Sequence, residues 1–209
     1  LNNILYGISG MAIQTLLAFV LRTIFIQTLG ATYLGVNGLM TSLLSMLSLA
    51  ELGVGTAITF SMYDPLAKKD KIKINSLMTF YKKVYMAVGI IVITIGLVIM
   101  PFLKYIAKDA EGVDNLNLIF FLFLLNTSFT YFFAYKRTLI IADQKEYLIV
   151  PLKTGFYALM VVLQSGVLII FQNFIFFLVM QLCSKLLENI FINRYIHRNY
   201  SYFTTQSEN

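Results

Sequence analysis

The chain has 209 residues, of which 58% are hydrophobic and only 12% are charged, and its mean hydropathy is +0.77. Soluble domains carry about 25% charged residues, so this composition excludes a water-soluble globule. A pI near 9.3 would favour nucleic acid binding in a soluble protein. In a membrane protein the same excess of basic residues indicates cytoplasmic loops, and we expect no nucleic-acid partner.

Apolar runs of about 20 residues match the thickness of a bilayer and predict an all-α integral membrane protein with six transmembrane helices. The runs are continuous and do not alternate with period two, which favours helices over a β-barrel. An uncharged turn over 28–34 separates the first two, and little more than Gln172 and Asn173 separates the last two. In chain order the predicted spans are 3–27, 35–63, 84–103, 116–135, 154–171 and 174–195.

Basic residues gather on one side of this predicted bundle. The other side has only Lys104 and Lys108, which acidic neighbours balance. Because Lys and Arg accumulate in cytoplasmic loops, both termini are predicted to be cytoplasmic. The basic side carries Lys68, Lys69, Lys71, Lys73, Lys82, Lys83, Lys136, Arg137, Lys145, Lys153, Arg194 and Arg198.

The ends of the chain indicate a piece of a longer protein. Residue 1 is Leu, no second copy of the six-span unit follows, and residues 201–209 are polar like the start of a linker. Within the chain, residues 72–83 can form either an amphipathic helix on the membrane surface or an extension of the third span. Residues 1–200 are therefore expected to form one six-helix unit.

The second predicted span carries a polar stripe. Its members follow each other at spacings of three or four residues, so they share one helix face. Such a stripe either lines a water-filled cavity or allows close helix packing. A carboxylate at Glu51 favours the cavity, and a buried, neutral structural Glu51 is the alternative. The stripe comprises Asn37, Thr41, Ser45, Ser48, Glu51, Gly55 and Thr59.

Three further charges fall inside spans and are hypotheses of function by default. Lys185 and Glu188 share a face of the sixth span with Gln181, and they are either an intrahelical ion pair or members of one chamber with Glu51 at the same depth. Arg22 either extends to the outer headgroups or clamps an anion, because a guanidinium binds phosphate oxygens bidentately.

The fourth span adds a polar track formed by Asn126, Thr130 and Arg137, which leads to the cytoplasmic mouth. An interior with several cations and few carboxylates suits an anionic amphiphile. A bulk ion channel fits less well, because the sequence contains no repeated ring of charged residues.

Motifs for catalysis are missing from the sequence. We find no Walker A pattern for ATP and no paired-Asp motif for a sugar nucleotide. The chain has one cysteine, Cys183, and one histidine, His197, so a disulfide within this chain and a His- or Cys-based metal cluster are excluded. We therefore expect no enzyme activity, no cofactor and no metal.

Three segments carry a resemblance to a known family. The run LGATYLGVNGL at 29–39, LSLAELGVGTAI at 47–58 and YFFAYKRTLIIADQKEYL at 131–148 resemble Wzx-type polysaccharide-repeat-unit flippases of the multidrug/oligosaccharidyl-lipid/polysaccharide exporter superfamily. Family members have two related lobes of helices. The resemblance implies that residues 1–200 are the N-terminal lobe and that residues 201–209 begin the inter-lobe linker.

The resemblance also implies a function. The substrate would be an oligosaccharide on undecaprenyl diphosphate, moved to the outer leaflet of the bacterial inner membrane by alternating access for polysaccharide or capsule synthesis. Arg22 would attract the diphosphate, and Glu51 and Glu188 would couple transport to H⁺ or Na⁺. Implied partners are the lipid-linked oligosaccharide, membrane lipids, polysaccharide polymerase and glycosyltransferases.

Three other functions stay open. A multidrug and toxin extruder shares the fold but needs acidic groups for organic cations. A membrane scaffold for polysaccharide synthesis would not need polar stripes. An integral-membrane glycosyltransferase would need a cytoplasmic nucleotide-sugar site that the sequence does not show.

Overall fold

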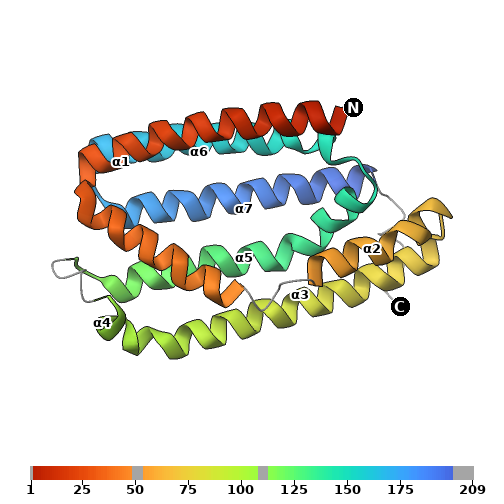
Figure 1. The fold of residues 1–209 in the computed structure, drawn as a ribbon, viewed down its shortest axis with the longest axis horizontal. Coiled ribbons are helices and arrows are strands. Elements are labelled where there is room, and N and C mark those ends of the chain that lie inside the picture. The colour runs from red at the N-terminus through yellow and green to blue at the C-terminus, as the bar shows by residue number, and fades with distance from the viewer. Residues whose placement is uncertain (1, 49–53, 108–112, 200–209) are drawn as a thin grey trace.

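A computed structural model describes residues 2–48, 54–107 and 113–199. These residues form a bundle of helices (Figure 1) and contain no strand. Five stretches among them are long and apolar enough to span a membrane. The all-α, multi-pass membrane fold is therefore confirmed. The helices are α1 (Asn2–Ser48), α2 (Val54–Ala67), α3 (Lys71–Ile99), α4 (Leu103–Ile106), α5 (Leu116–Ala142), α6 (Val150–Phe171) and α7 (Phe174–Asn199), with 3₁₀ turns at Met100–Phe102 and Glu146–Leu148.

The first predicted span and the beginning of the second, residues 35–48, belong to one long helix that is broken at Gly30. Residues 54–63 of the second predicted span lie in α2, and 49–53 are outside the described residues. Gly30 has φ 86° and ψ 177°, a conformation that glycine adopts without a steric penalty. The chain reverses there, so residues 31–48 turn back across the bundle (Figure 1). The turn expected over 28–34 is thus concentrated in a single residue.

The second part of α1 and α2 run in the same direction, and taken together they alternate in direction with the first part of α1, α3, α5, α6 and α7 along the chain (Figure 1). The first part of α1 packs on α6, α7 lies between α6 and α5, and α5 packs on α3 and α2. The start of α1 and the end of α7 lie at the same end of the bundle, beside the α2–α3 turn. This arrangement agrees with the predicted common side of both termini. The predicted linker, 201–209, lies outside the described residues.

Several helices extend beyond the spans that hydropathy predicts. The third span was expected at 84–103, whereas α3 begins at Lys71 and is continuous, so 72–83 extend the third span. Asp70 caps this start by accepting a hydrogen bond from the Lys73 amide at 3.1 Å. Hydropathy detects only the apolar part of a helix, but backbone hydrogen bonds continue into the charged ends.

The α6–α7 connection is the tight turn that the sequence predicts. Gln172 has a φ of 46°, and the Asn173 side-chain oxygen accepts hydrogen bonds from the amides of Ile175 at 2.9 Å and Phe176 at 3.2 Å. The amide groups at a helix start otherwise lack partners, so Asn173 stabilises the beginning of α7.

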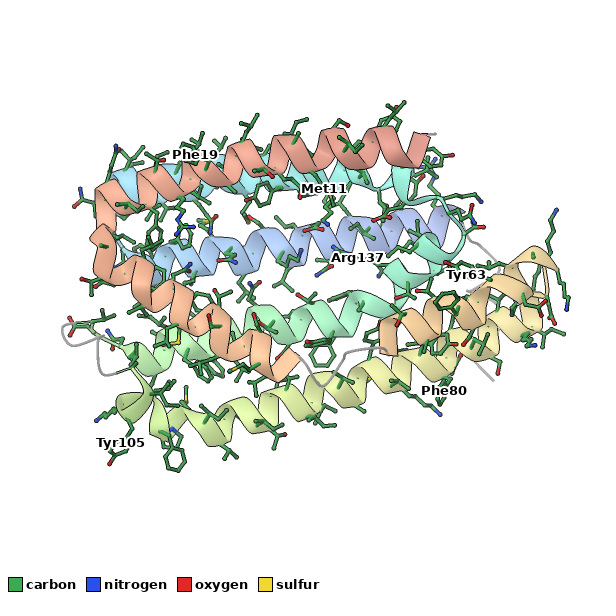
Figure 2. The ribbon with its side chains drawn as sticks, viewed as in Figure 1. Met11, Phe19, Tyr63, Phe80, Tyr105 and Arg137 are labelled. Carbon is green, nitrogen blue, oxygen red and sulfur yellow. The ribbon has the colours of Figure 1, made fainter. Side chains whose placement is uncertain are left out.

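The bundle packs through small residues inside and presents apolar side chains outside. A Cβ atom added at Gly96 on α3 would lie 2.4 Å from Leu124 Cδ1 on α5, so these helices meet very closely. Phe19, Phe80 and Tyr105 are highly exposed and point away from the bundle (Figure 2). Such exposed apolar residues fit a surface that contacts lipid.

Candidate functional site

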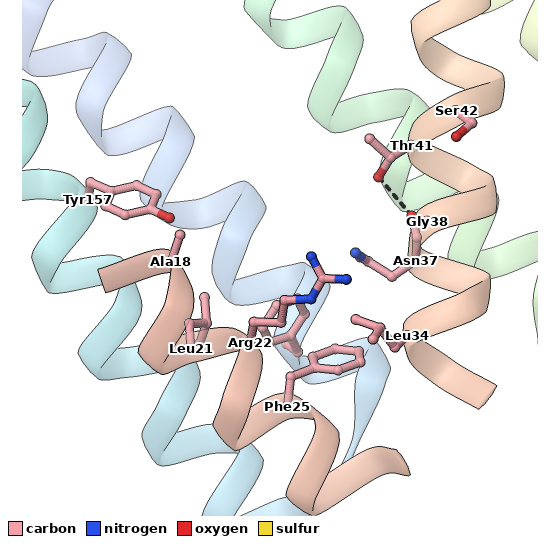
Figure 3. A pocket seen from close by; sticks show the side chains of 11 residues that line it. Ala18, Leu21, Arg22, Phe25, Leu34, Asn37, Gly38, Thr41, Ser42 and Tyr157 are labelled. Carbon is pink, nitrogen blue, oxygen red and sulfur yellow. Dashed lines mark hydrogen bonds between the residues drawn. The ribbon is translucent and has the colours of Figure 1, made fainter. Parts of the chain in front are cut away.

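A pocket of about 430 Å³ lies between the two parts of α1, α6 and α7 (Figure 3). It brings together three of the residues singled out from the sequence, Arg22, Asn37 and Thr41. The remaining lining residues are Ala18, Leu21, Phe25, Leu34, Gly38, Ser42, Tyr157 and Phe177.

The reversal at Gly30 creates this pocket. Arg22 comes from the first part of α1, whereas Asn37 and Thr41 come from the part after the break. The Arg22 guanidinium points toward the Asn37 side chain (Figure 3). Within the described ranges, Arg22 forms no ion pair and no hydrogen bond, so its donors are directed into the pocket.

Polar side chains of the pocket are arranged to accept as well as donate hydrogen bonds. The hydroxyl of the lining residue Thr41 donates to the Asn37 backbone carbonyl at 2.7 Å. The hydroxyl of Ser45, which follows the lining residues on the same helix, donates to the Thr41 backbone carbonyl at 2.8 Å. This local bonding satisfies each hydroxyl proton in an apolar medium while the oxygen can still accept a hydrogen bond. Of the same predicted stripe, the Ser48 side chain and the whole of Glu51 lie outside the described residues.

The wall beneath these polar groups is aromatic. Phe25 packs edge-on against Phe174 and Phe177 of α7, with ring centroids 5.5 and 5.1 Å apart. The contact is rigid because these rings are buried. The pocket therefore combines a fixed apolar wall with a cation, an amide and hydroxyl groups.

A separate charged cluster joins α5 to α7. Arg137 on α5 donates to one oxygen of the Glu188 carboxylate, and Lys185 donates to the other at 3.0 Å. Arg137 also donates to the Asn189 side-chain oxygen at 3.3 Å. The Glu188 side chain is only 9% exposed, whereas those of Arg137 and Lys185 are 22% and 26% exposed. Arg137 lies between α5 and α7 in Figure 2.

One of the two arrangements that the sequence leaves open is present in this cluster. Lys185 and Glu188 do form an intrahelical ion pair, and Arg137 joins them from a neighbouring helix rather than standing free at the cytoplasmic mouth. Two cations share one carboxylate, so the cluster keeps an excess positive charge. The proposed chamber with Glu51 cannot be drawn, since Glu51 is not among the placed residues.

The remaining predicted site residues do not join either group. Thr130 is exposed and donates to the Asn126 carbonyl at 3.1 Å. The Asn126 side-chain oxygen is buried and has no hydrogen-bond partner in the placed part of the chain. Gln181 is half-buried on α7. The predicted single track along the fourth span therefore divides into separate polar positions.

Sequence reasoning missed several residues that the structure brings to these sites. Ser42 and Tyr157 line the Arg22 pocket, and Asn189 contacts Arg137. Asn193, one helical turn beyond Asn189, accepts a hydrogen bond from Lys136. The spacing of 185, 189 and 193 by four residues was the available signal, because it extends the polar face of α7 toward its basic end.

Comparisons with protein-family models, with curated proteins and with solved structures give no match to this chain. Within residues 2–48, 54–107 and 113–199, no group of three His, Cys, Asp or Glu side chains is placed to hold a metal ion.

Proposed function

We propose that the chain belongs to a flippase that moves an anionic lipid-linked oligosaccharide from the inner to the outer leaflet of the bacterial inner membrane. The observation that supports this most is the pocket in which Arg22 faces Asn37 and Thr41 above a buried aromatic wall. Arg22 offers paired donors to diphosphate oxygens. The amide and hydroxyl groups offer partners to sugar hydroxyls.

Charge balance favours an anion over the organic cations of a multidrug extruder. Among the described residues of the spans, Glu188 is the carboxylate inside the bundle, and two cations already neutralise it. A cation-binding cavity needs an uncompensated negative group. Arg22, which is exposed in its open pocket, and the excess charge near Arg137 instead provide two positions that attract phosphate.

The size of the pocket suggests how the substrate would be shared. A volume of about 430 Å³ holds a diphosphate and part of one sugar but not a whole oligosaccharide. We propose that this six-helix unit forms one wall of a larger cavity, whose other wall comes from a second lobe. Transport would then proceed by alternating access, with Glu51 and Glu188 as the carboxylates that couple it to an ion gradient.

The test is a leaflet assay in the host with the full-length gene deleted and then restored. We expect lipid-linked repeat units to accumulate on the cytoplasmic leaflet and Arg22→Ala to fail in rescue. Lys104→Ala is the matched control, since it removes one exposed positive charge near the same end of the bundle. A normal leaflet distribution in the deletion strain would contradict the flippase and favour a scaffold.

A further inference from the structure

A second groove lies between the start of α6 and the end of α7. It has a volume of about 570 Å³ and opens at the basic end of the bundle, away from the Gly30 break. Its lining residues are Leu152, Phe191, Arg194, Tyr195 and Arg198. None of these lines the Arg22 pocket.

The part of this groove nearest the end of α7 is cationic. Arg194 and Arg198 are one helical turn apart on α7, and both are exposed. Lys153 on α6 follows the lining residue Leu152 and is also exposed. In the part of the chain that the structure describes, neither arginine forms an ion pair. Two guanidinium groups one turn apart can together bind the oxygens of a phosphodiester.

The part of the groove nearest the middle of α7 is apolar, and an apolar surface continues from it along α6 and α7. Phe191 is 50% exposed and packs against Phe156 of α6, with ring centroids 5.1 Å apart. Further toward the middle of the bundle, Leu187 on α7 and Leu159 on α6 are 46% and 49% exposed. A chain of methylene groups can lie along this surface, since these side chains are apolar and exposed.

We propose that this groove is a binding site for an anionic phospholipid, with its phosphodiester on Arg194 and Arg198 and an acyl chain along Phe191. Its two halves match the two halves of a phospholipid, which a soluble anion or a peptide would not use together. Basic pockets between membrane helices at the negatively charged cytoplasmic surface bind anionic headgroups. This lipid site is separate from the proposed transport function. It lies on α6 and α7 at the basic end of the bundle.

The test uses the purified full-length protein in detergent, with phosphatidylglycerol or phosphatidylcholine added and bound lipid counted by native mass spectrometry. We expect wild type to retain phosphatidylglycerol in preference to phosphatidylcholine. The Arg194→Gln, Arg198→Gln double variant should lose about tenfold in this preference, because it removes two contacts to the headgroup.

A matched control changes the same number of charges elsewhere at the same end. Lys82 and Lys83 are exposed on α3, on the opposite side of the bundle from α6. The Lys82→Gln, Lys83→Gln variant should bind phosphatidylglycerol as wild type does. An equal loss in both double variants would overturn the proposal, because it would mean that net charge alone attracts the lipid.

Two further experiments distinguish a site for a phospholipid from a site for a free anion. Inorganic phosphate at millimolar concentration should not displace phosphatidylglycerol, and displacement would overturn the proposal in favour of a soluble anion site. Leu152→Trp fills the apolar floor without changing a charge, so it should also weaken lipid retention. Unchanged lipid retention in this variant would contradict an acyl chain in the groove. Because Leu152→Trp changes no charge, it also tests the proposal if the double arginine variant does not fold.

Discussion

Arg137 on α5 and Lys185 on α7 hold the two oxygens of one carboxylate, that of Glu188, inside the bundle. The three residues come from two helices, so the contact fixes α5 against α7. A buried carboxylate is tolerated only when it is paired and hydrogen-bonded, and here each oxygen has its own cation. The cluster therefore stabilises the packing of α5 on α7, whatever else it does.

Replacing Glu188 by Gln should destabilise the protein by about 3 kcal/mol, the lower end of the cost of breaking a buried ion pair, because Arg137 and Lys185 would be left partly buried without a counter-charge. Denaturant unfolding in detergent, followed by circular dichroism, measures this change. Lys185→Gln should cost less, since Arg137 continues to pair with Glu188.

The same pair can be tested by a double-mutant cycle. Arg137→Gln combined with Glu188→Gln should lose at least about 1 kcal/mol less than the sum of the two single changes. Additive losses would contradict the ion pair between α5 and α7. Unfolding in detergent is again the measurement, so all four proteins are compared under one condition.

Close packing of α3 on α5 predicts a second effect. Gly96→Ala should destabilise the protein by about 1–3 kcal/mol, because the new methyl group would overlap Leu124 at 2.4 Å. Gly155→Ala on α6 is the control, since nothing lies within 4 Å of its added Cβ. Leu124→Ala should restore part of the loss in the Gly96→Ala background, and no restoration would contradict the overlap.

The break in α1 predicts a third effect that comes from the backbone alone. Gly30→Ala should cost about 1–3 kcal/mol, because φ of 86° with ψ of 177° is essentially restricted to glycine. Nothing lies within 4 Å of an added Cβ at Gly30 or at Gly35. Gly35→Ala makes the same substitution inside the helix without the strain, so the unfolding free energy of this variant should equal that of wild type or exceed it by up to about 1 kcal/mol.

Hydropathy and charge were sufficient to predict the membrane fold. The apolar runs locate the long helices of the described residues, except that the second run covers both the end of α1 and most of α2. The tight turn at Gln172 and Asn173 follows directly from the sequence, and the basic residues mark one end of the bundle. Helix ends were less accurate, because charged residues such as Lys71 to Lys83 continue a helix by backbone bonding that hydropathy does not detect.

The site was only partly predictable. Spacing placed Asn37 and Thr41 on one helix face, but Arg22 lies on the segment before the break, and only the reversal at Gly30 brings it to them. Similarly, the periodicity of α7 paired Lys185 with Glu188, whereas the contribution of Arg137 depends on how α5 packs against α7. Contacts between helices are tertiary information that helical periodicity does not contain.

The central claim is that Arg22 binds the diphosphate of a lipid-linked substrate. The most direct measurement is the affinity of the purified full-length protein for undecaprenyl diphosphate, compared among wild type, Arg22→Ala, Arg22→Lys and the control Lys104→Ala. Loss of a charged hydrogen bond of about 1.5–3 kcal/mol predicts a decrease of about ten- to a hundredfold for Arg22→Ala. Arg22→Lys should be intermediate, because a lysine cannot bind bidentately. Equal affinities of wild type and Arg22→Ala would contradict the account.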